Sequence, residues 1–358
     1  MLPFRSTLAA VALALAAGCA GGATPSTPAG RIDQAVRDAG FRGALLVARR
    51  GTVIARSAYG PADEAAGIAN TPTTHFRIGS VTKQLVAAAI LLRRDRGQLA
   101  VEDSVCRHLA PCPDAWKPIT LRHLLTHTSG IPDYTNFTDF PSRISIPATT
   151  DELLARFRGA PLDAPPGDHW HYSNSGYVVL GAVLEQATGL SWDEVLRREV
   201  FTPLGMASTR LDSDVPALPD HASGYLSPGV RPVRLALTEF AASGGLASTV
   251  DDLFAWDEAL RAGRLLSTAS LAEATTAQVP CPPGAALGEH LGYGYGWFSA
   301  QIDGRPYAYH WGRIDGFVSS NGFDAADGTV VVLLSNLETS GTFGLSATLE
   351  GLAANWRY

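Results

Sequence analysis

The sequence predicts an α/β protein in which strands from both ends of the chain form one sheet and a helical lobe lies between them. Short β-branched or aromatic segments separated by turns occur at residues 43–59 and again at residues 292–334. Helical patterns broken by Pro and Gly occupy approximately residues 119–265. This order favours a two-lobed molecule with a functional site in the cleft between the lobes.

The expected elements follow in chain order from local patterns. Residues 43–59 are predicted to form two strands joined by a turn at Arg50-Gly51. The helix that contains Lys83 is apolar nearly all round and should end near Gly97, so we expect it to be buried in the centre. The remaining elements are helices at 120–127, 151–158, 177–189 and 249–262, strands at 292–302, 307–311, 317–323 and 329–334, and a final helix from about 343 to 356.

Composition limits the classes of function. The chain has 358 residues, of which 46% are hydrophobic and 17% charged, so it can bury a sizeable core in two lobes or one large catalytic unit. The formal net charge is -6, which argues against nucleic acid as a partner.

The N-terminus is predicted to be a targeting segment. Residues 1–19 combine a short basic start, an apolar run and small residues before Cys19, and they resemble a lipoprotein signal peptide. We expect cleavage before Cys19 and lipid on that cysteine, with plain secretion as the alternative. Residues 20–30 are then a flexible tether, and residues 31–358 the folded domain. The lipid is the expected contact with the membrane, which would place the protein in the cell envelope, or otherwise in the periplasm or outside the cell.

An exported protein meets an oxidising compartment, which changes the interpretation of its cysteines. Cys106 and Cys112 flank a short segment and are close enough in sequence for a local disulfide. Two buried thiols are the alternative.

A serine and a lysine at helical spacing form the first candidate for chemistry. Ser80 and Lys83 are three residues apart at the start of the apolar helix, so their side chains share a face. The chain contains only two lysines, Lys83 and Lys117, and arginine makes up the rest of its basic residues. Arginine keeps its proton, whereas a desolvated lysine can act as a base. A solvated lysine on a core helix is the alternative interpretation.

Two further motifs follow in order, Tyr172-Ser173-Asn174 in a loop and His310-Trp311-Gly312 at the end of a strand. With Ser80-Val81-Thr82-Lys83, they resemble the penicillin-recognising serine hydrolases, a family that includes class C β-lactamases, D-alanyl-D-alanine carboxypeptidases and related esterases. Nearly the whole chain after the tether shares this resemblance, through FRIGSVTK, LLTHTSGIPDY, YSNSGY, PLGM, ASGGLASTVDDL and YGYGW.

The resemblance implies a β-lactamase/transpeptidase-like fold, with an antiparallel sheet flanked by helices beside an all-helical lobe. It also implies acyl transfer, in which Ser80 attacks a carbonyl carbon and Lys83 or Tyr172 is the base. Asn174 would hold Lys83 and a substrate amide. The backbone N–H groups of Ser80 and Arg313 would form the oxyanion hole.

The third motif departs from the Lys-Thr-Gly or Lys-Ser-Gly of β-lactamases. A neutral His310 attracts a substrate carboxylate less than an ammonium does, and Trp311 offers no hydroxyl. His310 remains a candidate proton donor, and Gly312 would let the substrate approach the strand. We therefore expect hydrolysis of small esters, D-amino-acid amides or cell-wall peptide. The alternatives are a β-lactamase with real turnover, or a penicillin-binding sensor without turnover.

Other candidate sites are weaker. His123 and His127 have the spacing of a zinc helix but lack the glutamate that would follow the first histidine, so we expect a structural role. Asp168, His169 and His171 are adjacent loop residues of a kind that is more often solvent-facing. No Gly-x-Ser-x-Gly elbow and no Gly-Lys phosphate loop occur. We expect no metal and no cofactor.

Overall fold

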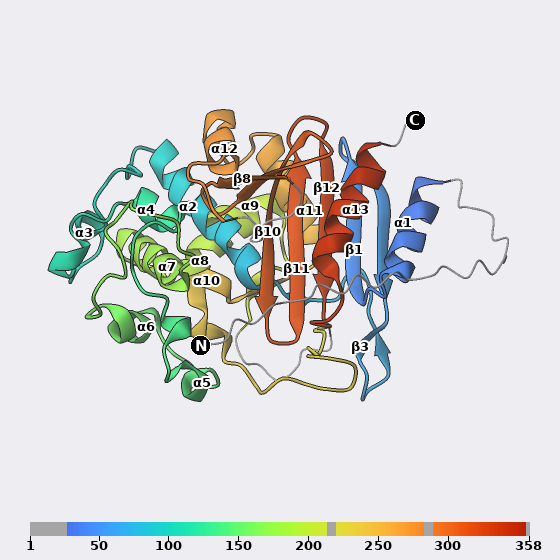
Figure 1. Cartoon of the computed structure of the whole chain (residues 1–358), viewed down its shortest axis with the longest axis horizontal. Helices are drawn as coiled ribbons and strands as arrows, with labels where there is room; N and C mark the ends of the chain where they lie inside the picture. The colour runs from blue at the N-terminus through green and yellow to red at the C-terminus, as the bar shows by residue number, and fades with distance from the viewer. Residues whose placement is uncertain (1–26, 213–219, 283–288, 356–358) are drawn as a thin grey trace, which may run out of the picture.

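The computed structural model describes residues 27–212, 220–282 and 289–355, and the expected signal peptide and Cys19 lie outside this part of the chain. Its main feature is a seven-stranded sheet of order β2-β1-β12-β11-β10-β9-β8, in which every pair is antiparallel (Figure 1). Strands from both ends of the chain therefore meet in one sheet, as predicted. The strands are β1 (Gly43–Arg49), β2 (Thr52–Tyr59), β8 (Glu289–Tyr293), β9 (Phe298–Ile302), β10 (Arg305–Ile314), β11 (Phe317–Asp324) and β12 (Thr329–Ser335).

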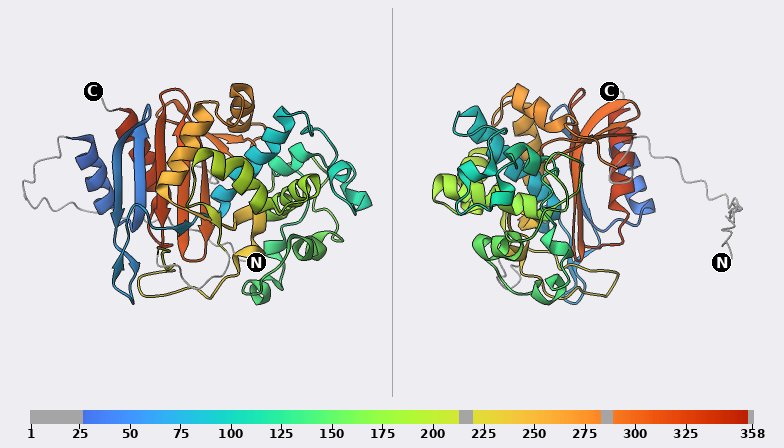
Figure 2. Two further views of the ribbon diagram at one scale, coloured as in Figure 1. Left: turned by 180° about the vertical axis from the view of Figure 1, so that it is seen from behind. Right: turned by 60° about the vertical axis from the view of Figure 1, so that its left-hand side comes forward.

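Helices cover both faces of this sheet. Helices α1 (Pro28–Asp38) and α13 (Thr342–Ala354) lie on one face, and the other helices lie on the opposite side (Figure 2). In β1, Leu45 and Val47 pack with α1 and α13, whereas Ala44 and Leu46 belong to the larger core on the other face. This period-two alternation buries the strand on both sides.

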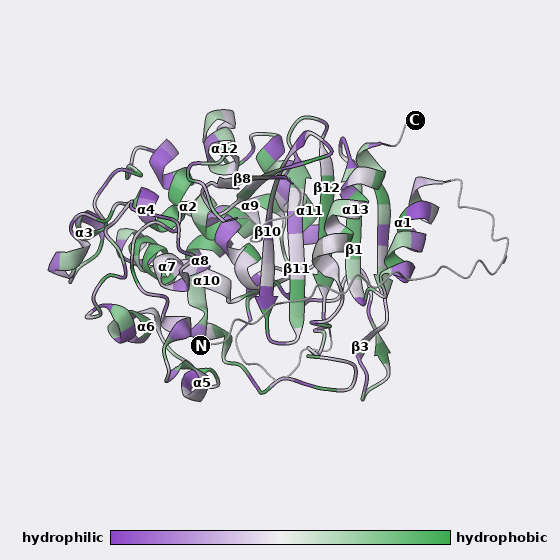
Figure 3. Cartoon of the chain, viewed as in Figure 1, coloured by the Kyte–Doolittle hydropathy of each residue, from purple (hydrophilic) through white to green (hydrophobic). Residues whose placement is uncertain are grey.

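The central helix on that second face is α2 (Thr82–Asp95), which carries hydrophobic residues along most of its length (Figure 3). All of its residues from Thr82 to Arg93 are buried. Gly97 follows the helix with φ 69°, a conformation that suits glycine after a helix C-terminus. The predicted burial and end of this helix are both confirmed.

The helical lobe packs beside the sheet, with α7 in contact with α2. The helices of the intervening chain are α3 (Val105–His108), α4 (Leu121–Leu125), α5 (Phe140–Arg143), α6 (Thr150–Phe157), α7 (Asn174–Thr188), α8 (Trp192–Leu196), a π-helical segment (Arg197–Phe201), α9 (Thr202–Leu204), α10 (Ala241–Gly244), α11 (Val250–Arg261) and α12 (Thr268–Thr275). Short strands form two small sheets, β3 (Pro61–Asp63) with β4 (Ile68–Ala69), and β5 (Phe76–Arg77), β7 (Leu246–Ser248) and β6 (Arg210–Leu211). The 3-10 turns are Gly79–Val81, Asp114–Trp116, Tyr134–Asn136 and Leu237–Glu239.

Three predicted boundaries are wrong. Helix α11 packs on β1 and β12, so the helical lobe ends before it and not at residue 265. Residues 28–30 of the expected tether are helical, because Thr27 caps α1 by accepting a hydrogen bond from the Gly30 amide. The single strand predicted at 292–302 is two strands, because the chain turns at Gly296 (φ 80°) to pack against the backbone of α2.

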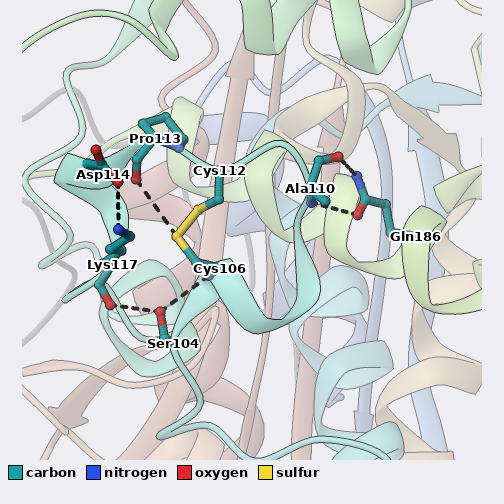
Figure 4. Close-up of a disulfide and its surroundings, with 8 residues drawn as sticks. All are labelled: Ser104, Cys106, Ala110, Cys112, Pro113, Asp114, Lys117 and Gln186. Carbon is teal, nitrogen blue, oxygen red and sulfur yellow. Dashed lines mark hydrogen bonds and ion pairs between the residues drawn. A yellow bond between two sulfur atoms is a disulfide. The ribbon is translucent and has the colours of Figure 1, made fainter.

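The structure contains the Cys106–Cys112 disulfide predicted as one of two alternatives (Figure 4). The loop that it closes is fastened to α7, since the Ala110 amide donates to Gln186 Oε1 (2.8 Å) and Gln186 Nε2 donates to the Ala110 carbonyl (2.6 Å). Within the described residues, no helix combines the length and the apolar character needed to cross a membrane.

Candidate active site

Ser80 lies in the 3-10 turn Gly79–Val81, immediately before α2. Gly79 adopts φ 49°, and the preceding Ile78 carbonyl accepts a hydrogen bond from Ser319 Oγ of β11 (2.7 Å). The turn is therefore fastened to the sheet, and the Ser80 side chain remains partly exposed beside it.

Lys83 lies one helical turn after Ser80, and its side chain is fully buried. Its Nζ lies 3.0 Å from Ser80 Oγ, 2.9 Å from Asn174 Oδ1 and 2.7 Å from the Ser243 carbonyl oxygen. Burial lowers the pKa of Lys83 from 10.5 to about 7, and the nearby Asp133 carboxylate opposes this shift. Near neutral pH, the amine is thus divided between its charged and neutral forms.

The partners of Lys83 determine how the neutral amine is oriented. Asp133 Oδ2 accepts from Asn174 Nδ2 (3.1 Å), which turns Asn174 Oδ1 toward the lysine. That oxygen and the Ser243 carbonyl can only accept, so they take the two N–H donors of a neutral amine. The nitrogen lone pair is then left for the Ser80 hydroxyl proton. Asn174, predicted in a loop, is in fact the first residue of α7, which adds to this fixed orientation.

Tyr172 precedes α7 and lies beside Ser80 and Lys83. Its ring centroid is 4.8 Å from Lys83 Nζ. Burial raises the pKa of Tyr172 above its usual value, while a hydrogen bond with the Ser80 hydroxyl acts in the opposite direction. The phenol is therefore protonated at neutral pH.

His310 lies in β10 with no exposed surface. Its Nδ1 lies 2.6 Å from the Trp311 carbonyl oxygen and its Nε2 lies 3.0 Å from the Tyr293 hydroxyl. Burial, helped by the Lys83 charge, lowers the pKa of His310 from 6.5 to about 3. Both ring nitrogens are occupied and the ring is neutral in this arrangement. The role of His310 as a proton donor to a leaving group stays a prediction.

Gly312 lies close to the protein backbone, which gives a second reason for a glycine at this position. A Cβ at this position would lie 2.0 Å from the Ile78 carbonyl oxygen and 2.5 Å from Ser319 Oγ. The missing side chain thus lets the segment before Ser80 approach β10. The expected approach of a substrate to Gly312 stays a prediction.

The Arg313 amide lies on the open edge of β10. Ile314 closes the hairpin with β11, so its amide bonds to β11 and that of Arg313 points to the opposite edge. Among the described residues, the pairing of β10 with β9 ends at Tyr309, so Arg313 lies beyond the part of the edge that β9 covers. A Cβ on Gly79 would lie 3.0 Å from the Arg313 nitrogen. The Arg313 amide and the Ser80 turn are therefore adjacent, as the predicted oxyanion hole requires.

Sequence reasoning missed several groups in this site. The Ser243 carbonyl had no signal in the sequence, because any residue supplies a backbone oxygen. Asp133 lies in the LLTHTSGIPDY stretch, which was assigned to the family without a role for this residue. His127 of the same stretch was expected only to be structural. His127 is nearly fully buried, and its ring centroid is 4.3 Å from that of Tyr172. Tyr293 connects it to His310.

Apart from His127, the residues of the other sites considered from sequence are separate from this arrangement. His123 completes a capping box at the start of α4. Asp168 and His169 form an exposed ion pair, and His171 is exposed. Among the described residues, no group of three or more His, Cys, Asp or Glu side chains is arranged to hold a metal ion.

Fold and site together define a serine hydrolase with a serine–lysine–tyrosine constellation. The β-lactamase family profile matches residues 29–355, and the chain belongs to this family. Esterase EstB of Burkholderia gladioli is 33% identical over 87% of this chain and 90% of its own. Putative penicillin-binding protein PbpX of Bacillus subtilis is 29% identical over 88% of this chain and 75% of its own.

A solved structure of D-amino acid amidase from Ochrobactrum anthropi superposes with a TM-score of 0.78 at 25% identity, over 90% of this chain and 97% of the amidase. The chain spans 59% of the length of a longer relative, penicillin-binding protein 4* from Bacillus subtilis. The likeness to the amidase over almost its whole length confirms the predicted antiparallel sheet with a helical lobe.

Proposed function

We propose that the protein hydrolyses small esters or amides of D-amino acids through an acyl-enzyme formed on Ser80. The observation that carries the proposal is the buried Lys83 amine, 3.0 Å from Ser80 Oγ, with its other two hydrogen bonds directed to acceptors. A neutral Lys83 takes the Ser80 proton as Oγ attacks the carbonyl carbon.

The same geometry supports separate roles for the two candidate bases. Tyr172 is protonated, so it acts as a donor that passes its proton to the departing alcohol or amine, and Lys83 is the base. The negative oxygen of the tetrahedral intermediate would accept hydrogen bonds from the amides of Ser80 and Arg313. The Lys83 ammonium then returns its proton to the Tyr172 phenolate, which restores both groups to their starting forms. Water attacks the acyl-enzyme as the neutral Lys83 takes its proton, and the resulting ammonium gives a proton to Ser80 Oγ as the acid departs.

The substrate class rests on the two side chains that stand where β-lactamases have a lysine and a hydroxyl residue. In place of an ammonium and a hydroxyl, β10 offers a buried neutral His310 and the indole of Trp311, so these two positions provide no charge for a carboxylate. This favours uncharged esters and amides over β-lactams. The similarity to an esterase and to a D-amino acid amidase supports the same choice.

The test measures turnover of p-nitrophenyl butyrate, D-phenylalanine amide and nitrocefin by the wild type and by Ser80→Ala. We expect turnover of the ester or the amide, and a loss of about 10⁴-fold or more in Ser80→Ala. Mass spectrometry of the quenched reaction should find the acyl group on the Ser80 peptide. Turnover that survives in Ser80→Ala would refute the proposal, and efficient nitrocefin turnover would refute its substrate class.

Export with lipid on Cys19 belongs to the same proposal. The Cys106–Cys112 disulfide supports it, since such bonds persist in oxidising compartments. Mass spectrometry of the N-terminal peptide tests it, and a chain without lipid that begins beyond Cys19 would contradict it.

A further inference from the structure

Three buried polar side chains from separate elements meet behind Tyr172. His127 follows α4, Tyr293 is in β8 and His310 is in β10, and their exposed fractions are 2%, 0% and 0%. His127 Nε2 lies 3.2 Å from the Tyr293 hydroxyl, which lies 3.0 Å from His310 Nε2. A buried row of hydrogen bonds of this kind is stable only if every donor has an acceptor.

The two ends of this row of hydrogen bonds fix the protonation of His127 Nδ1 and of His310 Nδ1. At one end, the Ser173 amide donates to His127 Nδ1 (3.1 Å), so that nitrogen carries no proton. At the other end, the Trp311 carbonyl can only accept, so His310 Nδ1 carries a proton and donates to it (2.6 Å).

If both imidazoles are neutral, each remaining donor of this row of hydrogen bonds has an acceptor. His127 Nε2–H donates to the Tyr293 oxygen, and the Tyr293 O–H donates to His310 Nε2. Burial first and the Lys83 charge second lower the pKa values of both imidazoles. The ionisable groups that face the two rings are Lys83 of α2, Tyr172 and His171 before α7, Tyr177 of α7 and Tyr293 of β8.

This row of hydrogen bonds is suited to holding groups in place and not to moving protons. Its ends are a backbone amide and a backbone carbonyl, neither of which exchanges a proton with Ser80 or Lys83. One end holds the residue after Tyr172, and the His127 ring packs 4.3 Å from the Tyr172 ring. The other end holds the Trp311 carbonyl, two residues before the Arg313 amide.

We propose that His127, Tyr293 and His310 form one positioning unit, with both imidazoles neutral, that holds Tyr172 in register with the Arg313 edge of β10. It connects the helical lobe, which carries the proton donor, to the sheet, which carries the oxyanion amide. The inference rests on the proposed function for its catalytic consequence, but its hydrogen-bond directions do not depend on any reaction.

The kinetic test replaces Tyr293 by phenylalanine, which removes the central hydroxyl and keeps the ring. The matched control is Tyr307→Phe, which removes a buried hydroxyl from β10 outside this unit. We expect kcat for p-nitrophenyl butyrate to fall about 10- to 100-fold in Tyr293→Phe, with KM within about threefold, because misplaced catalytic groups slow chemistry more than binding. An unchanged kcat, or an equal loss in Tyr307→Phe, would overturn the proposal.

The spectroscopic test uses the wild-type protein, so it does not depend on how a variant folds. Long-range ¹⁵N–¹H NMR distinguishes the two neutral tautomers of histidine. We expect the Nε2–H tautomer for His127, the Nδ1–H tautomer for His310, and titration of neither between about pH 5 and pH 8. The opposite tautomer, or titration of either ring in this range, would overturn the proposal. Turnover in Ser80→Ala would instead refute the proposed function and leave these tautomers untouched.

Discussion

Replacing Lys83 by methionine isolates the effect of one buried amine on activity and on stability. Lys83 is fully buried, and the only other lysine of the chain, Lys117, has 68% of its side chain exposed. The lowering of the Lys83 pKa from 10.5 to about 7 corresponds to about 5 kcal/mol in favour of the neutral amine. Lys117→Met is the matched control, because it makes the same chemical change on the surface.

The activity of the wild type should follow the neutral fraction of Lys83. We expect kcat/KM for p-nitrophenyl butyrate to fall about tenfold per pH unit below about pH 7, because the ammonium cannot accept the Ser80 proton. His127 and His310 have lowered pKa values, so neither accounts for an acid limb near neutrality. In Lys83→Met, activity should fall by about 10²-fold or more at every pH.

The stability of the same variant gives an independent measurement. Between the folded pKa near 7 and the unfolded pKa of 10.5, the unfolded chain holds a proton that the folded protein has lost, so stability rises with pH. The unfolding free energy of the wild type minus that of Lys83→Met should therefore increase by about 2 kcal/mol between about pH 7 and pH 9. The hydrogen bonds lost in the variant shift this difference by an amount that does not depend on pH.

Urea unfolding of the wild type, Lys83→Met and Lys117→Met at several pH values measures the slope. A stability difference between the wild type and Lys83→Met that stays flat over this range would mean that Lys83 titrates as it does in water. Together with an acid limb well away from neutral pH, that result would refute the assignment of Lys83 as the base.

Three other perturbations test the packing around the site. Gly312→Ala should lower kcat/KM for p-nitrophenyl butyrate at least about tenfold and should also lower the melting temperature. The reason is that its methyl group would lie 2.0 Å from the Ile78 carbonyl oxygen. Gly159→Ala is the control, because a Cβ at Gly159 meets nothing within 4 Å. Asp257 is fully buried and its pKa is raised. As the pH rises above about 4 the carboxyl ionises in the unfolded chain and not in the folded protein, so the wild type should lose stability relative to Asp257→Asn. Equal dependence of the unfolding free energy on pH in the two proteins, measured with urea, would contradict this. Reduction of the Cys106–Cys112 disulfide should lower the unfolding free energy by about 2 kcal/mol at a loop of this size, and an unchanged denaturation midpoint would count against that contribution.

Local signals in the sequence predicted much of the sheet and the central helix. The turn at Arg50-Gly51 and the strands beside it were confirmed, because a hairpin depends on neighbouring residues. Boundaries failed where distant contacts act. The strand predicted at 292–302 divides at Gly296, whose Cβ would lie 2.7 Å from the Lys83 carbonyl oxygen, and no local pattern predicts that approach.

The contact between Ser80 and Lys83 was predictable for the same reason. Ser80 and Lys83 are three residues apart, on the 3-10 turn and the first turn of α2 that follows it. Their 3.0 Å contact therefore follows from local geometry. The role of His310 was not predictable in this way. Its ring nitrogens are occupied by Trp311 and by Tyr293, which becomes a neighbour only after β8, β9 and β10 pair.

The sequence by itself therefore determined the family, the order of strands and helices along the chain, and the serine–lysine pair, because each depends on residue types and short spacings. Tertiary structure decided the protonation of that pair and its surroundings. The Ser243 carbonyl lies 160 residues from the Lys83 amine that it accepts from, and the low pKa of Lys83 exists only because the folded chain excludes water around it.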